Sequence, residues 1–226
     1  MSLINFQPEL FKKIRNASVH SQPFPHLYIN DFLPSDLWRS LREAFHVLHF
    51  KKFFEGAVPV YHIDSSSDLF LQAFRDEIVD AVICKGLRAH FLSFEDGKTK
   101  SLKASYGRVR CLEKPFYRSI YLAKNPEGGT IPIHLDDHWA SFQLVFYLGD
   151  HLGERTSTTD LAIPIDAHAA LPDPLELMKF STTNYGTSSN ALLAFVNNER
   201  SYHGLASPLP AERWTICVSA HYHDNG

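Results

Sequence analysis

Short β-prone runs fill the chain from about residue 104 onward, and they constrain the fold more than any other feature. The runs are YGRVRCLEK, RSIYLAK, SFQLVFYLG, NALLAFVNN and RWTICVSAHY, each rich in aromatic or β-branched residues. Clusters of turn-forming residues such as NPEGGT separate them. Many short strands with tight connections predict a β-sandwich or jelly roll in this part of the chain.

Apolar residues recur at helical spacing in the earlier part of the chain. PSDLWRSLREAFHVLHF begins with a Pro-Ser start signal and puts one apolar stripe on a helix: Leu37, Leu41, Phe45 and Leu48. SDLFLQAFRDEIVDAVICKGL can be capped by Ser67 or Asp68 and has a similar stripe: Leu71, Phe74, Ile78 and Val82. Before both helices, PFPHLYINDFLP predicts a short strand followed by a turn.

The chain has 226 residues, 44% of them hydrophobic, which suits one globular domain. We therefore predict an α+β fold that forms a single domain over residues 1–226. Residues 1–103 would be a mostly helical supporting region, and residues 104–223 would form the β core. His151 to Asn190 lacks strong periodicity apart from one further strand in GERTSTTDLAIP and a helical turn in DPLELMKF, so we expect a loop that closes over a site.

Composition excludes several classes of partner. The formal net charge is −3, and the chain has no Lys/Arg-rich run, which argues against nucleic acid and anionic membranes. The N-terminus lacks a secretory signal, and no apolar run approaches the roughly 18 residues of a membrane helix. The cysteines Cys84, Cys111 and Cys217 are widely spaced, with no C-x-x-C. This pattern suits a reducing compartment, and we predict a cytoplasmic protein.

The stretch IPIHLDDHWASFQLVFYLGD begins with polar residues that can bind metal and continues as a buried strand. Because side chains alternate across a strand, His134 and Asp136 share one face and can reach one divalent cation. Asp137 would point away to a turn or rim, and His138 would be exposed. A second His-x-Asp, at His62, runs into a serine-rich loop, so we interpret His62 as a surface residue.

The stretch NALLAFVNNERSYHGLASPLPAERWTICVSAHYH supplies the remaining polar groups. A His-x-Asp pair and one distant histidine, His203, are the ligand set that holds non-haem Fe(II) with open coordination positions. Arg213 would begin an inward-facing strand, where its guanidinium can pair bidentately with a small dicarboxylate. Thr215 lies on the same face of that strand.

The order His-x-Asp, strand, long loop, strand, Ser-Tyr-His-Gly and Arg-x-Thr resembles the Fe(II)- and 2-oxoglutarate-dependent dioxygenase superfamily, over about residues 105 to 223. The opening FPHLYINDFLPSDLWRSLREAF is similar to the N-termini of its prolyl-hydroxylase-like branch. The resemblance implies a double-stranded β-helix, a jelly-roll or cupin-like core. It implies His134, Asp136 and His203 as iron ligands, and Arg213 with Thr215 at the distal carboxylate of 2-oxoglutarate.

Tyr147 is open to two interpretations. The segment FYLG resembles the strand end where prolyl-hydroxylase-like members place a tyrosine against the same carboxylate. In the second interpretation, Tyr147 is an ordinary core aromatic residue whose hydroxyl has a hydrogen-bond partner. Trp139, Tyr121, Lys124, Arg200 and Trp214 could contact substrate or simply pack, while His221 and His223 suggest a frayed strand end.

The resemblance implies an enzyme that uses Fe(II), 2-oxoglutarate and O2 to oxidise a C–H bond, with release of succinate and CO2. Hydroxylation is favoured because Asp136 is present, whereas halogenating members lack this carboxylate. We predict a small polar metabolite as substrate, with a protein or peptide side chain as the alternative. Arg213 and Thr215 argue against a cupin-type protein that does not use 2-oxoglutarate. No H-E-x-x-H supports a zinc hydrolase, and the intact residues argue against a vestigial binding protein.

Overall fold

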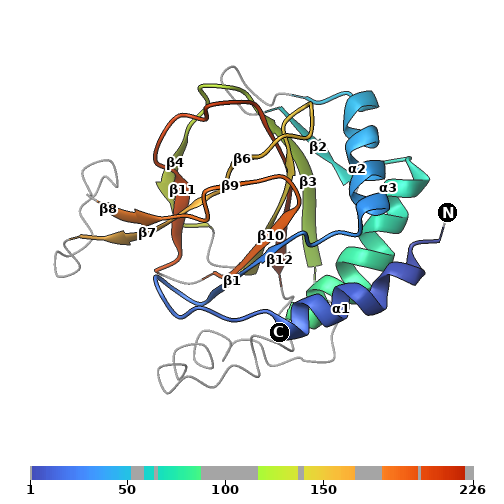
Figure 1. The fold of residues 1–226 in the computed structure, drawn as a ribbon, viewed down its shortest axis with the longest axis horizontal. Helices are drawn as coiled ribbons and strands as arrows, with labels where there is room; N and C mark the ends of the chain where they lie inside the picture. Colours follow the sequence, from blue (N-terminus) through green and yellow to red (C-terminus); the bar gives the residue numbers. More distant parts are fainter. Residues whose placement is uncertain are drawn as a thin grey trace.

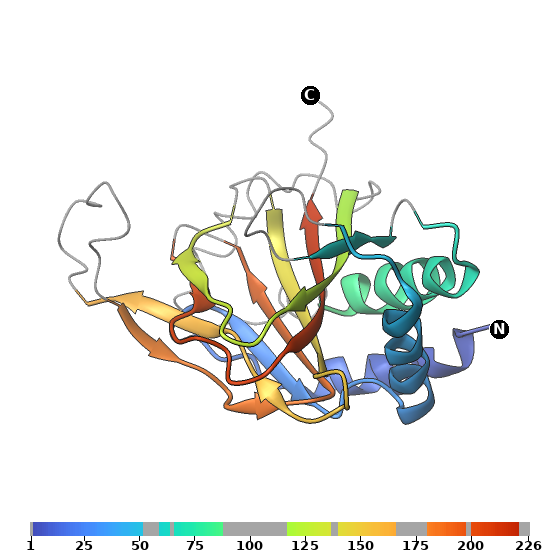
Figure 2. The same cartoon turned by 90° about the horizontal axis from the view of Figure 1, so that it is seen from above.

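Two antiparallel β-sheets face each other as a jelly-roll-like barrel, and helices cover the outer face of the larger sheet (Figure 1). The computed structural model describes residues 2–51, 59–63, 66–87, 117–136, 140–165, 180–197 and 200–221. The mixed helix and sheet fold predicted from the sequence is confirmed. Seen from above, the helices lie on one side of the barrel and the smaller sheet on the other (Figure 2).

The helical segments precede most of the strands. They are η1 (Ile4–Phe6), α1 (Gln7–Asn16), α2 (Ser35–Val47), α3 (Leu69–Ala73) and the π-helix η3 (Phe74–Cys84). The carboxylate of Asp68 caps α3 by accepting from the backbone N–H groups of Phe70 and Leu71. Both predicted apolar stripes are buried against the larger sheet, apart from Leu48 at the end of α2, which is half-buried. None of the described helices is long and apolar enough to cross a membrane.

The larger sheet has six strands in the order β1-β10-β5-β12-β3-β2. Their bounds are β1 (His26–Asn30), β2 (Val60–His62), β3 (Tyr117–Asn125), β5 (Ala140–Gly149), β10 (Ala191–Val196) and β12 (Arg213–His221). The predicted runs RSIYLAK, SFQLVFYLG, NALLAFVNN and RWTICVSAHY form β3, β5, β10 and β12, and PFPHLYINDFLP contains β1. The run YGRVRCLEK lies outside the described residues.

Strand β12 has an apolar face and a polar face. Its even-numbered residues pack under the helices as part of the main core: Trp214, Ile216, Val218 and Ala220. Its odd-numbered residues face the barrel interior: Arg213, Thr215 and Cys217 line a cavity, and the Ser219 hydroxyl donates to Gln143 on β5. The period-two alternation of a strand therefore separates the core from the interior groups.

The smaller sheet has four strands in the order β4-β11-β7-β8, and a two-stranded ribbon joins β6 to β9. Their bounds are β4 (Ile131–His134), β6 (Thr156–Ser157), β7 (Asp160–Pro164), β8 (Phe180–Thr183), β9 (Thr187–Ser188) and β11 (Tyr202–Leu205). The strand expected within GERTSTTDLAIP is present as β7, with the short β6 before it, whereas β8 and β9 were not expected. The strands β6, β8 and β9 are short and rich in Ser and Thr, so they lack the apolar alternation that marks a strand. Closure of this segment over a site stays a prediction. Residues 166–179, with most of DPLELMKF, lie outside the described residues.

Strand β2 was not expected from the sequence. It is a three-residue edge strand that pairs with β3, and it places His62 opposite Tyr121. The interpretation of His62 as a surface residue is wrong, since its side chain is half-buried and lines a cavity. With β1 and β2, the earlier part of the chain contributes both edges of the larger sheet.

Candidate active site

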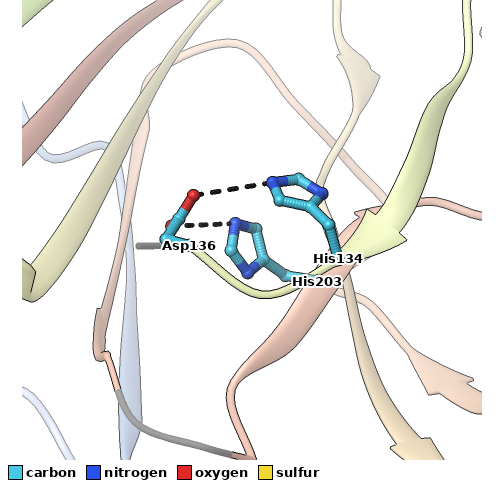
Figure 3. A group of neighbouring side chains, drawn as sticks. All are labelled: His134, Asp136 and His203. Carbon is cyan, nitrogen blue, oxygen red and sulfur yellow. Dashed lines mark ion pairs between the residues drawn. The ribbon is translucent and has the colours of Figure 1, made fainter. Parts of the chain in front are cut away.

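His134, Asp136 and His203 meet at one edge of the smaller sheet, and we call them the His–Asp–His cluster (Figure 3). One donor atom from each side chain lies within 4.8 Å of the others. The Asp136 carboxylate is 3.5 Å from Nε2 of His134 and 3.3 Å from Nε2 of His203. Side-chain exposure rises from 10% at His203 to 38% at His134, so the cluster opens to solvent on the His134 side.

Strand pairing brings the two histidines together. His134 ends β4 and lies directly opposite His203 on β11, and their rings are 4.5 Å apart. The register shifts just after His203, at Gly204. A Cβ atom on Gly204 would lie 2.6 Å from the carbonyl oxygen of Ile131 and 2.8 Å from that of Pro132. The glycine that follows His203 in the sequence therefore permits the close approach of β4 and β11.

Backbone carbonyl groups fix the orientation of both imidazoles. Nδ1–H of His134 donates to the carbonyl of Pro132 at 2.8 Å, and Nδ1–H of His203 donates to the carbonyl of Ser201 at 2.8 Å. A carbonyl oxygen only accepts, so Nδ1 carries the proton in each ring. Nε2 is therefore the nitrogen of each ring that faces Asp136. It donates to the carboxylate while the ring is protonated, and it offers its lone pair to a metal once that proton is lost.

The charges of the cluster support one another. Burial raises the pKa of Asp136, but hydrogen bonds from His134 and His203 outweigh it and hold that pKa well below its usual range. The hydrogen bond to Asp136 raises the pKa of His134 against the opposing effect of burial. Asp136 is thus an ionised carboxylate, as a metal ligand must be.

A cavity of about 340 Å³ opens between the strands of the larger sheet and β4, and we call it the arginine cavity. Its size is at the lower end of the range for small-molecule sites, roughly 300–1,000 Å³. Residues of four strands line it: Val60, His62, Tyr121, Ala123, Asn125, Ile131, Arg213, Thr215 and Cys217. Ile131 at the start of β4 lines this cavity, and His134 ends the same four-residue strand, so the His–Asp–His cluster lies close to the cavity.

Arg213 is a buried cation that forms no ion pair with a carboxylate of the described residues. Its side chain is 3% exposed, and its Nε atom has no hydrogen-bond partner. Nη1 donates to the carbonyl of Ser157 at 3.4 Å, and no carboxylate among the described residues forms an ion pair with the guanidinium. Burial lowers the pKa of Arg213, and nearby Tyr147 counteracts this effect. An unsatisfied buried guanidinium is costly, so the site suits an anionic ligand that can accept from it.

Thr215 and Tyr147 lie next to each other across β12 and β5. Thr215 lines the arginine cavity, as the predicted inward face requires. The Tyr147 ring centre is 5.9 Å from the Arg213 guanidinium, and its hydroxyl accepts from the backbone N–H of Thr159 at 2.8 Å. The hydroxyl of Tyr147 is therefore satisfied as an acceptor, while its own hydrogen stays available to donate.

Tyr121 is a cavity residue that the sequence left unassigned. It pairs with Cys217 across β3 and β12, and both side chains line the arginine cavity. Cys217 and burial raise the pKa of Tyr121 well above its usual value, so the phenol stays protonated. The alternation of RSIYLAK could have placed it inside, once the inward face of β3 was known. Asp137, His138, Trp139 and His223 lie outside the described residues.

The donor set of the His–Asp–His cluster fits a divalent transition metal. Two neutral imidazole nitrogens and one carboxylate oxygen converge from one side, which is the facial arrangement of non-haem Fe(II) sites. The unpartnered Nε of Arg213 in the adjoining cavity fits a ligand with a carboxylate at that end.

The sequence matches no protein-family model and no curated protein. Solved structures do match the fold. A prolyl-4-hydroxylase from Pseudomonas putida superposes with a TM-score of 0.54 and 16% identity, over 95% of this chain and 99% of that one. An oxidoreductase of the 2OG-Fe(II) oxygenase family from Burkholderia pseudomallei has a TM-score of 0.54 and 10% identity, over 96% and 91%. The α-ketoglutarate-dependent epimerase SnoN has a TM-score of 0.50 and 10% identity, over 96% and 82%.

The fold is therefore the jelly-roll-like fold of 2-oxoglutarate- and Fe(II)-dependent oxygenases, and the resemblance drawn from the motifs is confirmed at this level. The identities are too low to carry more than the fold. The activity must be argued from the His–Asp–His cluster and the arginine cavity themselves.

Proposed function

We propose that this protein is an Fe(II)- and 2-oxoglutarate-dependent oxygenase that hydroxylates a C–H bond of its substrate. The observation that carries the proposal is a buried, unpaired Arg213 in a cavity beside a His–Asp–His cluster. Either feature alone is compatible with several activities. Together they provide an anion site within one small cavity and a metal site on β4 and β11 close to it, which suits a co-substrate that is both a chelator and a dicarboxylate.

Each residue has a defined task in this proposal. Nε2 of His134, Nε2 of His203 and the Asp136 carboxylate would hold the metal on one side and leave its other positions open. Arg213 would bind the distal carboxylate of 2-oxoglutarate, with the Thr215 hydroxyl on the same face. When bound, Fe(II) and 2-oxoglutarate supply the oxidation of a substrate C–H bond by O2, with release of succinate and CO2.

The barrel interior would protect this chemistry from water. Tyr121, on β3 opposite Cys217, keeps its phenolic proton and can donate it to a bound anion. The Phe195 ring lies 4.6 Å from the His203 ring and covers the inner side of the His–Asp–His cluster with apolar surface. A dry inner wall raises the strength of the charge-assisted bonds at both ends of the cavity.

For the substrate, we propose a small polar metabolite. His62 and Asn125 add polar groups to the cavity beyond Arg213, and these would orient such a molecule. The second candidate is a proline-containing peptide, because a prolyl-4-hydroxylase is among the structural neighbours and matches over nearly the whole of both chains. Succinate release with a pool of amino acids and sugars, compared with a pool of proline-containing peptides, separates the two classes.

The proposed use of 2-oxoglutarate is tested by thermal unfolding under argon with Mn(II) in place of Fe(II). At a concentration about 100-fold above Kd, 2-oxoglutarate should raise the Tm of the Mn(II)-loaded protein by about 5 °C or more. Without Mn(II) the rise should be much smaller, because the metal holds one end of the co-substrate. An unchanged Tm in the Mn(II)-loaded protein would contradict the proposal.

A further inference from the structure

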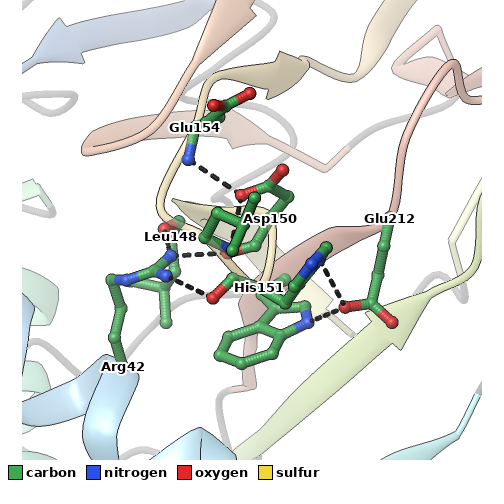
Figure 4. Close-up of polar contacts among 8 residues, drawn as sticks. Arg42, Leu148, Asp150, His151, Glu154 and Glu212 are labelled. Carbon is green, nitrogen blue, oxygen red and sulfur yellow. Dashed lines mark hydrogen bonds and ion pairs between the residues drawn. The ribbon is translucent and has the colours of Figure 1, made fainter.

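Arg42 on α2 lies on the helix-covered face of the larger sheet, opposite the face that lines the arginine cavity. Its guanidinium donates to three backbone carbonyls at and just after the end of β5 (Figure 4). Nη1 donates to the carbonyl of Leu148 at 2.7 Å and to that of Asp150 at 2.6 Å. Nη2 donates to the carbonyl of His151 at 3.0 Å. The side chain is 8% exposed, so these bonds form in a buried setting where charge-assisted hydrogen bonds are strong.

The Leu148 carbonyl belongs to a β-bulge in β5, and the carbonyls of Asp150 and His151 belong to the turn that follows it. Trp214 of β12 pairs with Gly149, while Thr215 pairs with Tyr147, so Leu148 is an extra residue in β5. A bulge leaves its extra residue outside the regular ladder and re-aims nearby side chains. Arg42 supplies the missing donor to Leu148. The extra residue Leu148 lies between Tyr147, the partner of Thr215, and Gly149, the partner of Trp214, so the bulge faces the first residues of β12.

Gly153 shows that the turn after the bulge is shaped around the guanidinium. Its φ is +90°, and a Cβ atom there would lie 3.2 Å from both Cζ and Nη2 of Arg42. The Asp150 carboxylate closes this turn by accepting from the backbone N–H groups of Leu152 and Glu154, each at 2.8 Å. The guanidinium of Arg42 therefore packs closely against this turn and is not on an open surface.

The residues on either side of Arg213 are held from the same direction. The Trp214 indole N–H donates to Glu212 at 2.6 Å, and its ring stacks on Phe45 of α2 at 5.2 Å. The Arg42 guanidinium lies 5.4 Å from the Trp214 ring. Helix α2 thus contacts the start of β12 in two ways: through Arg42 and the β5 bulge, and through the indole ring of Trp214.

We infer that Arg42 is a positioning residue that sets the aim of Arg213 through the β5 bulge, from outside the barrel. This rests on the proposed function only where binding of 2-oxoglutarate is the readout. Without the guanidinium, the Leu148 carbonyl loses its donor and the bulge can relax into a different register. Arg213 then shifts at the base of its side chain, and one of its two bonds to a bound carboxylate is misaligned.

The first measurement follows Arg213 itself and needs no ligand. Its Nε–H is buried and unpartnered, so in a side-chain NMR spectrum it gives a distinct arginine signal, assigned by its loss in Arg213→Lys. Arg42→Met keeps the apolar stem and removes the guanidinium, and it should displace the Arg213 signal. Gly153→Ala should displace it in the same way, by pushing Arg42 from its seat.

The second measurement titrates 2-oxoglutarate and Mn(II) separately. Losing one charge-assisted bond predicts at least about tenfold weaker 2-oxoglutarate binding in Arg42→Met, with an unchanged Kd for Mn(II). Arg39→Met is the matched control, since Arg39 lies on the same helix but makes only an exposed ion pair with Asp36. Ile14→Val on α1 controls for lost stability alone, because Ile14 is a core residue of another helix.

An Arg213 signal that stays in place in Arg42→Met, with a loss of Tm like that of Ile14→Val, would overturn the inference and leave Arg42 a purely structural residue. A displaced signal in both Arg42→Met and Gly153→Ala, but in neither control, would support it. If the wild-type protein fails to bind 2-oxoglutarate, the proposed function fails, while the NMR signal still decides whether Arg42 positions Arg213.

Discussion

The His–Asp–His cluster and the arginine cavity lie on facing sheets, and they differ in how their charges are satisfied. Asp136 has both histidine Nε2 atoms within 3.5 Å and accepts hydrogen bonds from them, so its carboxylate has partners within the cluster. Arg213 is more deeply buried than any of them, yet none of its described neighbours forms an ion pair with it. The Asp136 carboxylate therefore has ionic partners within the protein, whereas the Arg213 guanidinium needs an anion from a bound ligand.

This contrast gives the two ends different energetic roles. Loading the metal must displace an existing hydrogen-bonded network, and the histidine protons compete with it. Binding a carboxylate at Arg213 breaks no ion pair among the described residues. Variants at the two ends should therefore separate metal affinity, co-substrate affinity and ligand-free stability.

The largest effect is expected from removal of a metal ligand. Asp136→Ala and His203→Ala should each abolish Mn(II) binding and 2-oxoglutarate turnover, because a facial site with two remaining ligands no longer holds the ion. Isothermal titration with Mn(II) and circular dichroism test binding and folding together. His49→Ala removes an exposed histidine and serves as the control. His62→Ala should keep Mn(II) binding. If His62→Ala lost Mn(II) binding while Asp136→Ala kept it, the metal site would have to be assigned to the His-x-Asp that begins at His62.

Arg213→Ala should weaken 2-oxoglutarate binding by about tenfold to several hundredfold, because charge-assisted bonds contribute about 1.5–3 kcal/mol. The affinity of Arg213→Lys for 2-oxoglutarate should fall between those of the wild type and Arg213→Ala, since lysine keeps the charge and loses the planar guanidinium. The affinity for Mn(II) should not change. The ligand-free Tm of Arg213→Met should hold or rise, because an unpartnered buried guanidinium is removed. Equal 2-oxoglutarate affinity with a Tm several degrees lower would make Arg213 structural.

Gly204→Ala should weaken Mn(II) binding by about tenfold, as expected when the orientation of a ligand is disturbed. The added Cβ would press on the carbonyls of Ile131 and Pro132, and β4 has only β11 as a neighbour in the described sheet, so it can yield. His134 would then move away from His203. Gly86→Ala, whose Cβ meets only side chains of α1, is the control. Unchanged Mn(II) affinity in Gly204→Ala would show that β4 adapts without moving His134.

The smallest effect concerns Tyr147→Phe. If the phenol donates to the carboxylate at Arg213, 2-oxoglutarate binding should weaken by less than about tenfold, as for one neutral donor. Burial raises the pKa of Tyr147 to about 12, so the phenol keeps its proton and takes up or releases none below that pKa. The ratio of the Kd of Tyr147→Phe to the Kd of the wild type for 2-oxoglutarate should therefore be constant between about pH 6 and 9. Equal affinities with a lower Tm in the variant would identify an ordinary core aromatic.

The sequence predicted the two ends of the site for different reasons. His134, Asp136 and His203 were singled out by residue type and order, and the cross-strand pairing of His134 with His203 explains why these distant positions meet. Arg213 and Thr215 were placed on the inner face by strand parity, which needs only the start of a strong β run, and both line the arginine cavity. Their roles in binding metal and co-substrate stay predictions.

Three features could not be read from the sequence. Strand β2 is too short for a periodic signal, so the place of His62 in the cavity was missed. Strands β6, β8 and β9 are rich in Ser and Thr and are specified by their partners rather than by their own pattern. The bonds of Arg42 to a bulge in β5 arise only when α2 packs on the finished sheet, and nothing in the sequence around Arg42 marks them.

The alternating faces of β12 also limit how this chain can evolve. A substitution in the strand changes one side chain, whereas the insertion or deletion of a single residue would exchange the two faces beyond that point. Deletion at the start of the strand would turn Trp214 into the cavity and send Arg213 toward the helices. The connection before the strand, residues 206–212, is free of this constraint, so we expect changes of length to accumulate there and to be absent from the strand itself.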